Sequence, residues 1–93
     1  MYSEIVICLK DKVDEVFEKQ VNMLRERHHA QVLRMEVEEA NDYIKTGPTE
    51  VLFISDDEDM LLKAKEAGMA TNSPKAMRES YMKAMDTLAF LCR

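Results

Sequence analysis

In Val51-Leu52-Phe53-Ile54-Ser55-Asp56-Asp57-Glu58-Asp59, four apolar residues lead through one serine into four acids. An uninterrupted apolar run of this length is typical of a strand covered on both faces, as in a parallel sheet packed between helices. The acids then follow the carboxyl end of the strand, which is where open α/β sheets place their ligand sites. The stretch therefore predicts a buried parallel strand that ends in an acidic loop at the ligand-binding edge of a sheet.

The acidic loop has two interpretations. Carboxylates that lie this close repel one another unless solvent, a helix N-terminus or a cation compensates their charge. A cation such as Mg²⁺ held by Asp56, Asp57 and Asp59 would do so, and a metal or phosphate site is one interpretation. The other is an acidic helix start, because Asp and Glu are favoured in a first turn by capping and by the helix dipole. Both stay open from the local sequence.

Length, composition and charge limit the class of protein. The 93 residues have room for one α/β domain, residues 1–93, with one modest core. The net charge of −5 argues against a nucleic-acid partner and against an anionic membrane surface. No apolar run approaches the ~18 residues of a membrane span, and the start at Met1 lacks the basic residues of a signal peptide, so we expect a cytoplasmic protein.

Apolar periodicity predicts alternating strands and helices along the chain. The expected strands are 5–9, 31–37, 50–55 and a short 69–71. The second of these also fits one face of a helix, although alternation favours a strand. The helices are expected to start at a cap on Asp11, at about Glu38, after the acidic loop and at Ser73-Pro74, with Gly68 as a left-handed cap of the third.

This order of elements predicts a small three-layer Rossmann-like α/β domain with a short, mostly parallel sheet of three to four strands. In the common doubly wound order the first and third strands are neighbours, and their carboxyl ends flank the switch point of the topology. We therefore expect a polar pocket there, formed by residues that follow the first, third and fourth strands: Lys10, Asp11, Ser55, Thr71, Asn72 and Ser73.

Residues 48–56 and 64–71 resemble the fourth-motif region of haloacid dehalogenase-like hydrolases, and the span from the first to the last of them is about a quarter of the chain. It implies a Rossmann-like fold in which Asp56, with Asp57 as the adjacent acid, binds Mg²⁺. The commoner spacing of that family wants an acid where this chain has Met60, and Asp59 stands one residue early. Its nucleophilic Asp would fall on Leu9, which cannot form a phosphoenzyme, so the resemblance argues against phosphatase activity.

The residues Ser55 to Met60 are also similar to the Thr-x-Asp-x-Asp pattern of PIN-like ribonucleases. This second resemblance implies that Asp57 and Asp59 bind Mg²⁺ and activate water for phosphodiester hydrolysis. The acid that this family places directly after its first strand would be Asp11, slightly late in this chain.

Other chemistry-bearing residues favour structural roles. His28-His29 point about 100° apart on a helix, so we interpret them as helix-end or surface residues and not as metal ligands. Cys8 lies within the first apolar strand and is expected to be a buried reduced thiol. Methionines concentrate in and near the last helix, whose apolar stripe is Met77, Tyr81, Met85, Leu88 and Cys92. That surface favours a twofold homodimer, with core filling as the alternative.

Taken together, the residues favour a non-catalytic binding or regulatory domain that resembles a degenerate haloacid dehalogenase-like core. A divalent-cation site is expected at the end of the third strand, and the partner is a small ligand or a protein. The alternative is a Mg²⁺-dependent phosphohydrolase or PIN-like ribonuclease that uses the acids from Asp56 to Asp59. Neither interpretation names a ligand.

Overall fold

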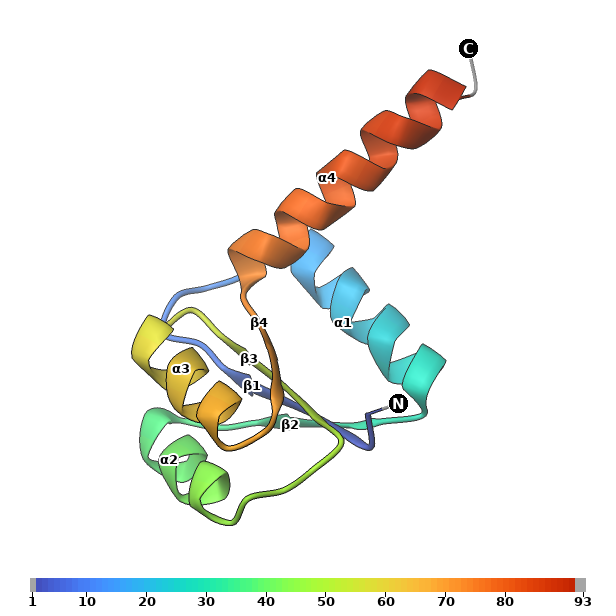
Figure 1. Ribbon diagram of the computed structural model, residues 1–93. Coiled ribbons are helices and arrows are strands. Elements are labelled where there is room, and N and C mark those ends of the chain that lie inside the picture. The colour runs from blue at the N-terminus through green and yellow to red at the C-terminus, as the bar shows by residue number, and fades with distance from the viewer. Residues whose placement is uncertain (1, 92–93) are drawn as a thin grey trace.

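The computed structural model describes residues 2–91, with side chains as far as Ala84. Strands and helices alternate along this part of the chain (Figure 1). The elements are β1 (Glu4–Cys8), α1 (Glu15–His28), β2 (Gln31–Arg34), α2 (Val37–Lys45), β3 (Val51–Ser55), α3 (Glu58–Glu66), β4 (Ala70–Asn72) and α4 (Pro74–Leu91). None of the described helices combines the length and apolar character needed to cross a membrane.

The strands form one parallel sheet in the order β2-β1-β3-β4. Helices α2 and α3 cover one face and α1 covers the other (Figure 1). This is the expected three-layer Rossmann-like arrangement, and β1 and β3 are neighbours as predicted. The carboxyl ends of β1 and β3 therefore meet at one edge of the sheet.

The apolar run of β3 is the centre of the core. All five of its residues are buried, and Val6 of β1 lies beside Phe53 in the parallel register. Successive side chains of a strand point to opposite faces. Phe53 accordingly packs with α2 and α3, while Ile54 packs with α1, so one strand supplies both halves of the core.

Helix α1 begins later than the sequence predicts. Its N-cap is Asp14, whose side chain accepts a hydrogen bond from the backbone N–H of Phe17 at 3.0 Å. The expected cap at Asp11 is wrong because the backbone N–H of that residue donates to Asp56, which holds it in the loop between β1 and α1. Either acid could cap a helix, and the tertiary contact decides between them.

The ambiguous second segment is a strand, as favoured, but a shorter one. β2 ends at Arg34, and Val37 already begins α2. The backbone N–H of Met35 still donates to the carbonyl of Ile7 at 2.9 Å, and the alternation of apolar residues continues past the last residue that β1 can pair. The predicted end at residue 37 is therefore too late.

Gly68 ends the α3 region in the left-handed conformation, with φ of 95°, as the sequence predicts. A β-carbon at this position would meet no atom within 4 Å, so only the backbone conformation selects glycine. We expect Gly68→Ala to lower the free energy of unfolding by about 1 kcal/mol, and Gly68→Asn by less, because Asn tolerates this conformation better. Urea denaturation followed by circular dichroism measures both changes, and equal stability of Gly68→Ala and the parent protein would contradict the expectation.

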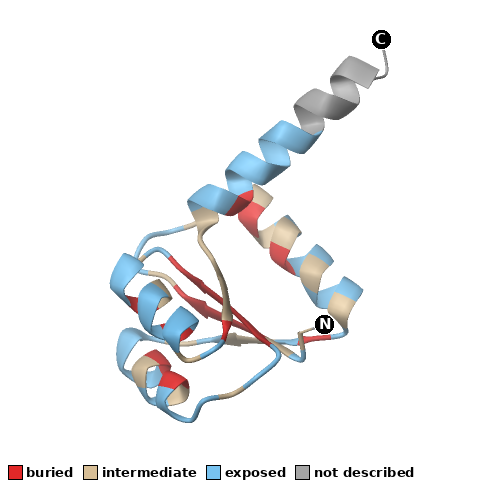
Figure 2. Cartoon of the chain, in the orientation of Figure 1, coloured by how far each residue is buried: buried red, intermediate tan, exposed pale blue. Residues whose placement is uncertain are grey.

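Helix α4 is the one part of the described chain that leaves the body (Figure 1). Its first residue is Pro74, as predicted. Ser73 caps the helix, because its hydroxyl accepts a hydrogen bond from the N–H of Ala76 at 3.1 Å. Of the expected apolar stripe, Met77 is buried and Tyr81 is 37% exposed. The described turns of α4 beyond its start are exposed (Figure 2). The other stripe positions, Met85, Leu88 and Cys92, lie outside the described side chains. The extents of 49 × 26 × 22 Å reflect this projecting helix.

Candidate functional site

Asp56, the first acid after β3, joins the two loops at the switch point. Both of its carboxylate oxygens accept from the backbone N–H of Lys10, at 3.0 and 3.1 Å, and one of them also accepts from the N–H of Asp11 at 3.0 Å. Lys10 and Asp11 follow β1, so this side chain bridges residues that are 45 and 46 positions apart. The prediction that Lys10 and Asp11 lie close to Asp56 is therefore confirmed.

Asp57 is the N-cap of α3. One oxygen accepts from the N–H of Asp59 at 2.9 Å and from that of Met60 at 3.4 Å. The other oxygen lies 2.9 Å from Nζ of Lys10. Ser55 supports the same turn, because its fully buried hydroxyl accepts from the N–H of Asp57 at 3.1 Å. The acidic helix start, one of the two interpretations of this loop, is thus present in the structure.

The charges at this edge stabilise each other. The ammonium of Lys10 lowers the pKa of Asp57, and hydrogen bonds from the N–H groups of α3 lower it further. The same hydrogen bond and attraction raise the pKa of Lys10. Lys10 keeps 62% of its side-chain surface exposed, whereas Asp57 keeps 21%, so solvent screens the lysine more than its partner. The lysine therefore supplies part of the positive charge that four neighbouring acids need.

A cavity of about 380 Å³ lies next to these acids. Of the predicted pocket residues, Asp11 and Ser73 line it, together with Asp56. The others lie elsewhere: Ser55 is fully buried and Asn72 lines a second groove. Thr71 is half-buried in β4, where it lies beside Phe53 in the register. The complete lining is Asp11, Lys12, Val13, Asp56, Glu58, Leu61, Ser73, Pro74 and Lys75.

The hydrogen bonds limit what this edge can bind. Backbone N–H groups that follow the first strand are a common place for an anion in parallel sheets, and here two of them donate to Asp56. The oxygens of Asp56 and Asp57 all have a donor or ammonium partner already. Among the residues that the structure describes, no group of three or more His, Cys, Asp or Glu side chains is arranged to hold a metal ion. Asp59 contributes its backbone N–H, which donates to the carboxylate of Asp57.

The remaining sequence candidates occupy structural positions. His28 ends α1 and its ring lies 4.9 Å from that of Tyr2, while His29 is the left-handed C-cap. Cys8 is buried as expected, and burial together with the neighbouring carboxylates of Asp56 and Asp57 raises the pKa of its thiol. A raised pKa leaves little nucleophilic thiolate near neutral pH, so Cys8 is not an activated nucleophile.

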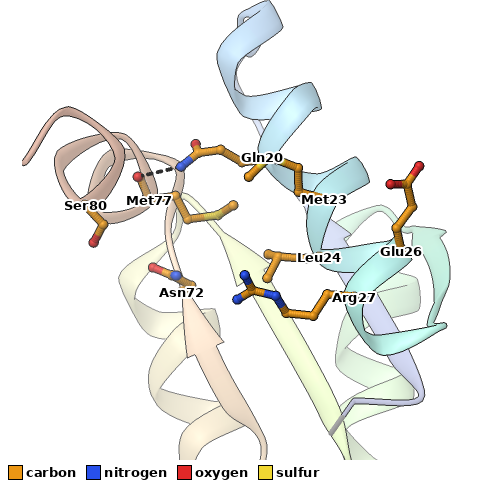
Figure 3. Close-up of a pocket in the computed structure, with 8 residues that line it drawn as sticks. All are labelled: Gln20, Met23, Leu24, Glu26, Arg27, Asn72, Met77 and Ser80. Carbon is orange, nitrogen blue, oxygen red and sulfur yellow. Dashed lines mark hydrogen bonds between the residues drawn. The ribbon is translucent and has the colours of Figure 1, made fainter. Parts of the chain in front are cut away.

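A second and larger groove, of about 580 Å³, was not predicted (Figure 3). It lies between α1, the end of β4 and the first turns of α4, and its lining combines apolar and polar side chains: Gln20, Met23, Leu24, Glu26, Arg27, Asn72, Met77 and Ser80. Nε2 of Gln20 donates to the carbonyl of Met77 at 2.8 Å, whereas Oε1 of the same side chain is buried and receives no hydrogen bond from the described residues. The sequence signal was weak, since Gln20 and Met23 merely flank the apolar stripe of α1.

Comparisons with known proteins identify no family. No protein-family model, no curated protein and no solved structure gives a significant match to the chain. The resemblances to haloacid dehalogenase-like hydrolases and PIN-like ribonucleases therefore stay predictions from residues 48–71, and the function has to be argued from the geometry.

Proposed function

We propose that this chain is a non-catalytic binding or regulatory domain, acting in the cytoplasm on a small ligand or a protein partner. The observation that carries the proposal is the bonding of Asp56, which accepts the N–H groups of Lys10 and Asp11. A carboxylate used to join two loops is poorly placed to activate water or bind a phosphate. The residue directly after β1 is Leu9, which cannot act as the nucleophile that a phosphatase needs at this position, and this further supports the proposal.

The second candidate is a Mg²⁺-dependent phosphohydrolase or ribonuclease. One observation favours it: the cavity of about 380 Å³ is lined by three acids, Asp11, Asp56 and Glu58. Mg²⁺ prefers carboxylate oxygens and retains several waters, so it would need only some of them. Any cation at Asp56, Asp57 and Asp59 would compete with the ammonium of Lys10, which already lies 2.9 Å from Asp57.

Hydrolysis assays and thermal melts separate the two candidates. We expect no Mg²⁺- or Mn²⁺-dependent hydrolysis of a generic phosphomonoester or of single-stranded RNA by the full chain. A metal-dependent activity that disappears in Asp57→Asn and persists in Asp42→Asn, an exposed acid on α2, would overturn the proposal. A melting midpoint that rises with Mg²⁺ without activity would add a cation site to a binding domain, because a ligand of the folded state raises the midpoint by mass action.

A further inference from the structure

Helix α4 presents apolar side chains to solvent on the part that leaves the body. Tyr81 is 37% exposed and Met82 54% exposed, and the described residues that follow Met77 on this helix are all exposed (Figure 2). An isolated helix in water is only marginally stable, and helices in proteins depend on packing an apolar face. The radius of gyration of 14.0 Å exceeds the ~12 Å expected for a compact domain of this length. The free monomer thus leaves this helix without the packing that it needs.

The groove beside α4 is the complementary surface. Helices α1 and α4 diverge from each other (Figure 1), and the groove of about 580 Å³ lies between them, next to Met77 (Figure 3). Met23, 60% exposed, and Leu24 form its apolar wall on α1. Three of the five large hydrophobic side chains that are exposed in the described structure, Met23, Tyr81 and Met82, therefore belong to this helix pair.

Charge favours a second copy as the occupant. Residues 1–73 contain sixteen Asp and Glu against nine Lys and Arg, whereas α4 contains three Lys and Arg against two Asp and Glu. A helix with a net charge of +1 is attracted to a body with a net charge of −7 on another molecule of the same chain. The same attraction acts within one molecule, where Arg78 of α4 forms an ion pair of 2.9 Å with Asp14 at the start of α1.

We propose that the groove between α1 and α4 receives α4 of a second copy of this chain, so that two molecules form a twofold dimer by exchanging their last helices. The inference goes beyond the proposed binding function and does not depend on the absence of catalysis. In a twofold contact each helix inserts into the groove of its partner, which covers Tyr81 and Met82 on both copies at once. A small ligand in the groove would leave those two side chains in water.

The test is the oligomeric state of the full chain by sedimentation velocity over a wide concentration range. We expect a dimer for the parent protein, and a rise of at least about tenfold in its dissociation constant for Met82→Glu and for Met23→Glu, because each charge would be buried at the contact. Leu62→Glu is the matched control: Leu62 lies on α3 and is 56% exposed, against 54% for Met82. The dimer of this control should remain intact.

Three results would overturn the inference. The first is a parent protein that is monomeric at all concentrations, the second is a dimer that neither Met82→Glu nor Met23→Glu weakens, and the third is equal weakening by Leu62→Glu. Circular dichroism melts show whether each variant is folded, and Met82→Lys replaces any variant that is not. A dimer that hydrolyses phosphoesters would contradict the proposed function while leaving this inference intact.

Discussion

Replacing Phe53 by alanine is expected to lower the free energy of unfolding by about 3–5 kcal/mol, as truncation of a buried Phe does in other cores. Phe53 is completely buried in β3 and packs with Ala40, Ile44 and Ala64 on α2 and α3. Ala40 and Ala64 are too small to fill the space that the ring leaves, and Met60 of α3 could fill only part of it. Since a small domain has only about 5–15 kcal/mol in total, a large part of the stability would be lost.

Urea denaturation followed by circular dichroism measures this change. Leu62→Ala is the control, because Leu62 is 56% exposed on α3 and its truncation should change stability by no more than about 0.5 kcal/mol. A loss below about 1 kcal/mol for Phe53→Ala would mean that the two helices collapse onto β3 and that the packing on this face is loose.

The fold could be predicted because its signals are local. An apolar run covered on both faces can belong to few arrangements, and Val51 to Ile54 is buried throughout. Gly68 and Ser73-Pro74 mark helix ends through backbone chemistry that does not depend on neighbours. The errors occurred where a contact between residues distant in the sequence decides where a helix begins. Asp14 and not Asp11 caps α1, because the N–H of Asp11 donates to Asp56 and holds this residue in the preceding loop.

The candidate site could be predicted in position but not in bonding. Adjacent β1 and β3 bring Lys10 and Asp11 to the acids after β3, as the topology required. Which oxygen accepts which N–H depends on distances that the sequence does not contain. The groove between α1 and α4 is harder still, because it exists only through the angle at which α4 leaves the sheet. No residue pattern within α4 encodes that angle.

Replacing Asp56 by alanine is expected to lower the free energy of unfolding by about 1–2 kcal/mol. The change removes the only side-chain acceptor that the described structure gives the backbone N–H groups of Lys10 and Asp11. Hydrogen bonds to a charged group contribute about 1.5–3 kcal/mol, but these are exposed, and water replaces part of the loss. Asp56→Asn should fall between the two proteins, because its amide keeps one acceptor oxygen.

Asp59→Ala is the control for Asp56→Ala, since Asp59 follows in the same acidic segment and contributes its backbone N–H to the cap of α3. Its removal should cost only the few tenths of a kcal/mol that a carboxylate gains near a helix N-terminus. Hydrogen exchange gives the local readout: the amides of Lys10 and Asp11 should exchange faster in Asp56→Ala and not in Asp59→Ala. Unchanged exchange would mean that the β1–α1 loop is held by other contacts, and the argument that Asp56 has a joining role would fail. The proposed function depends on that role, because an acid free of the loop is again available to bind a cation.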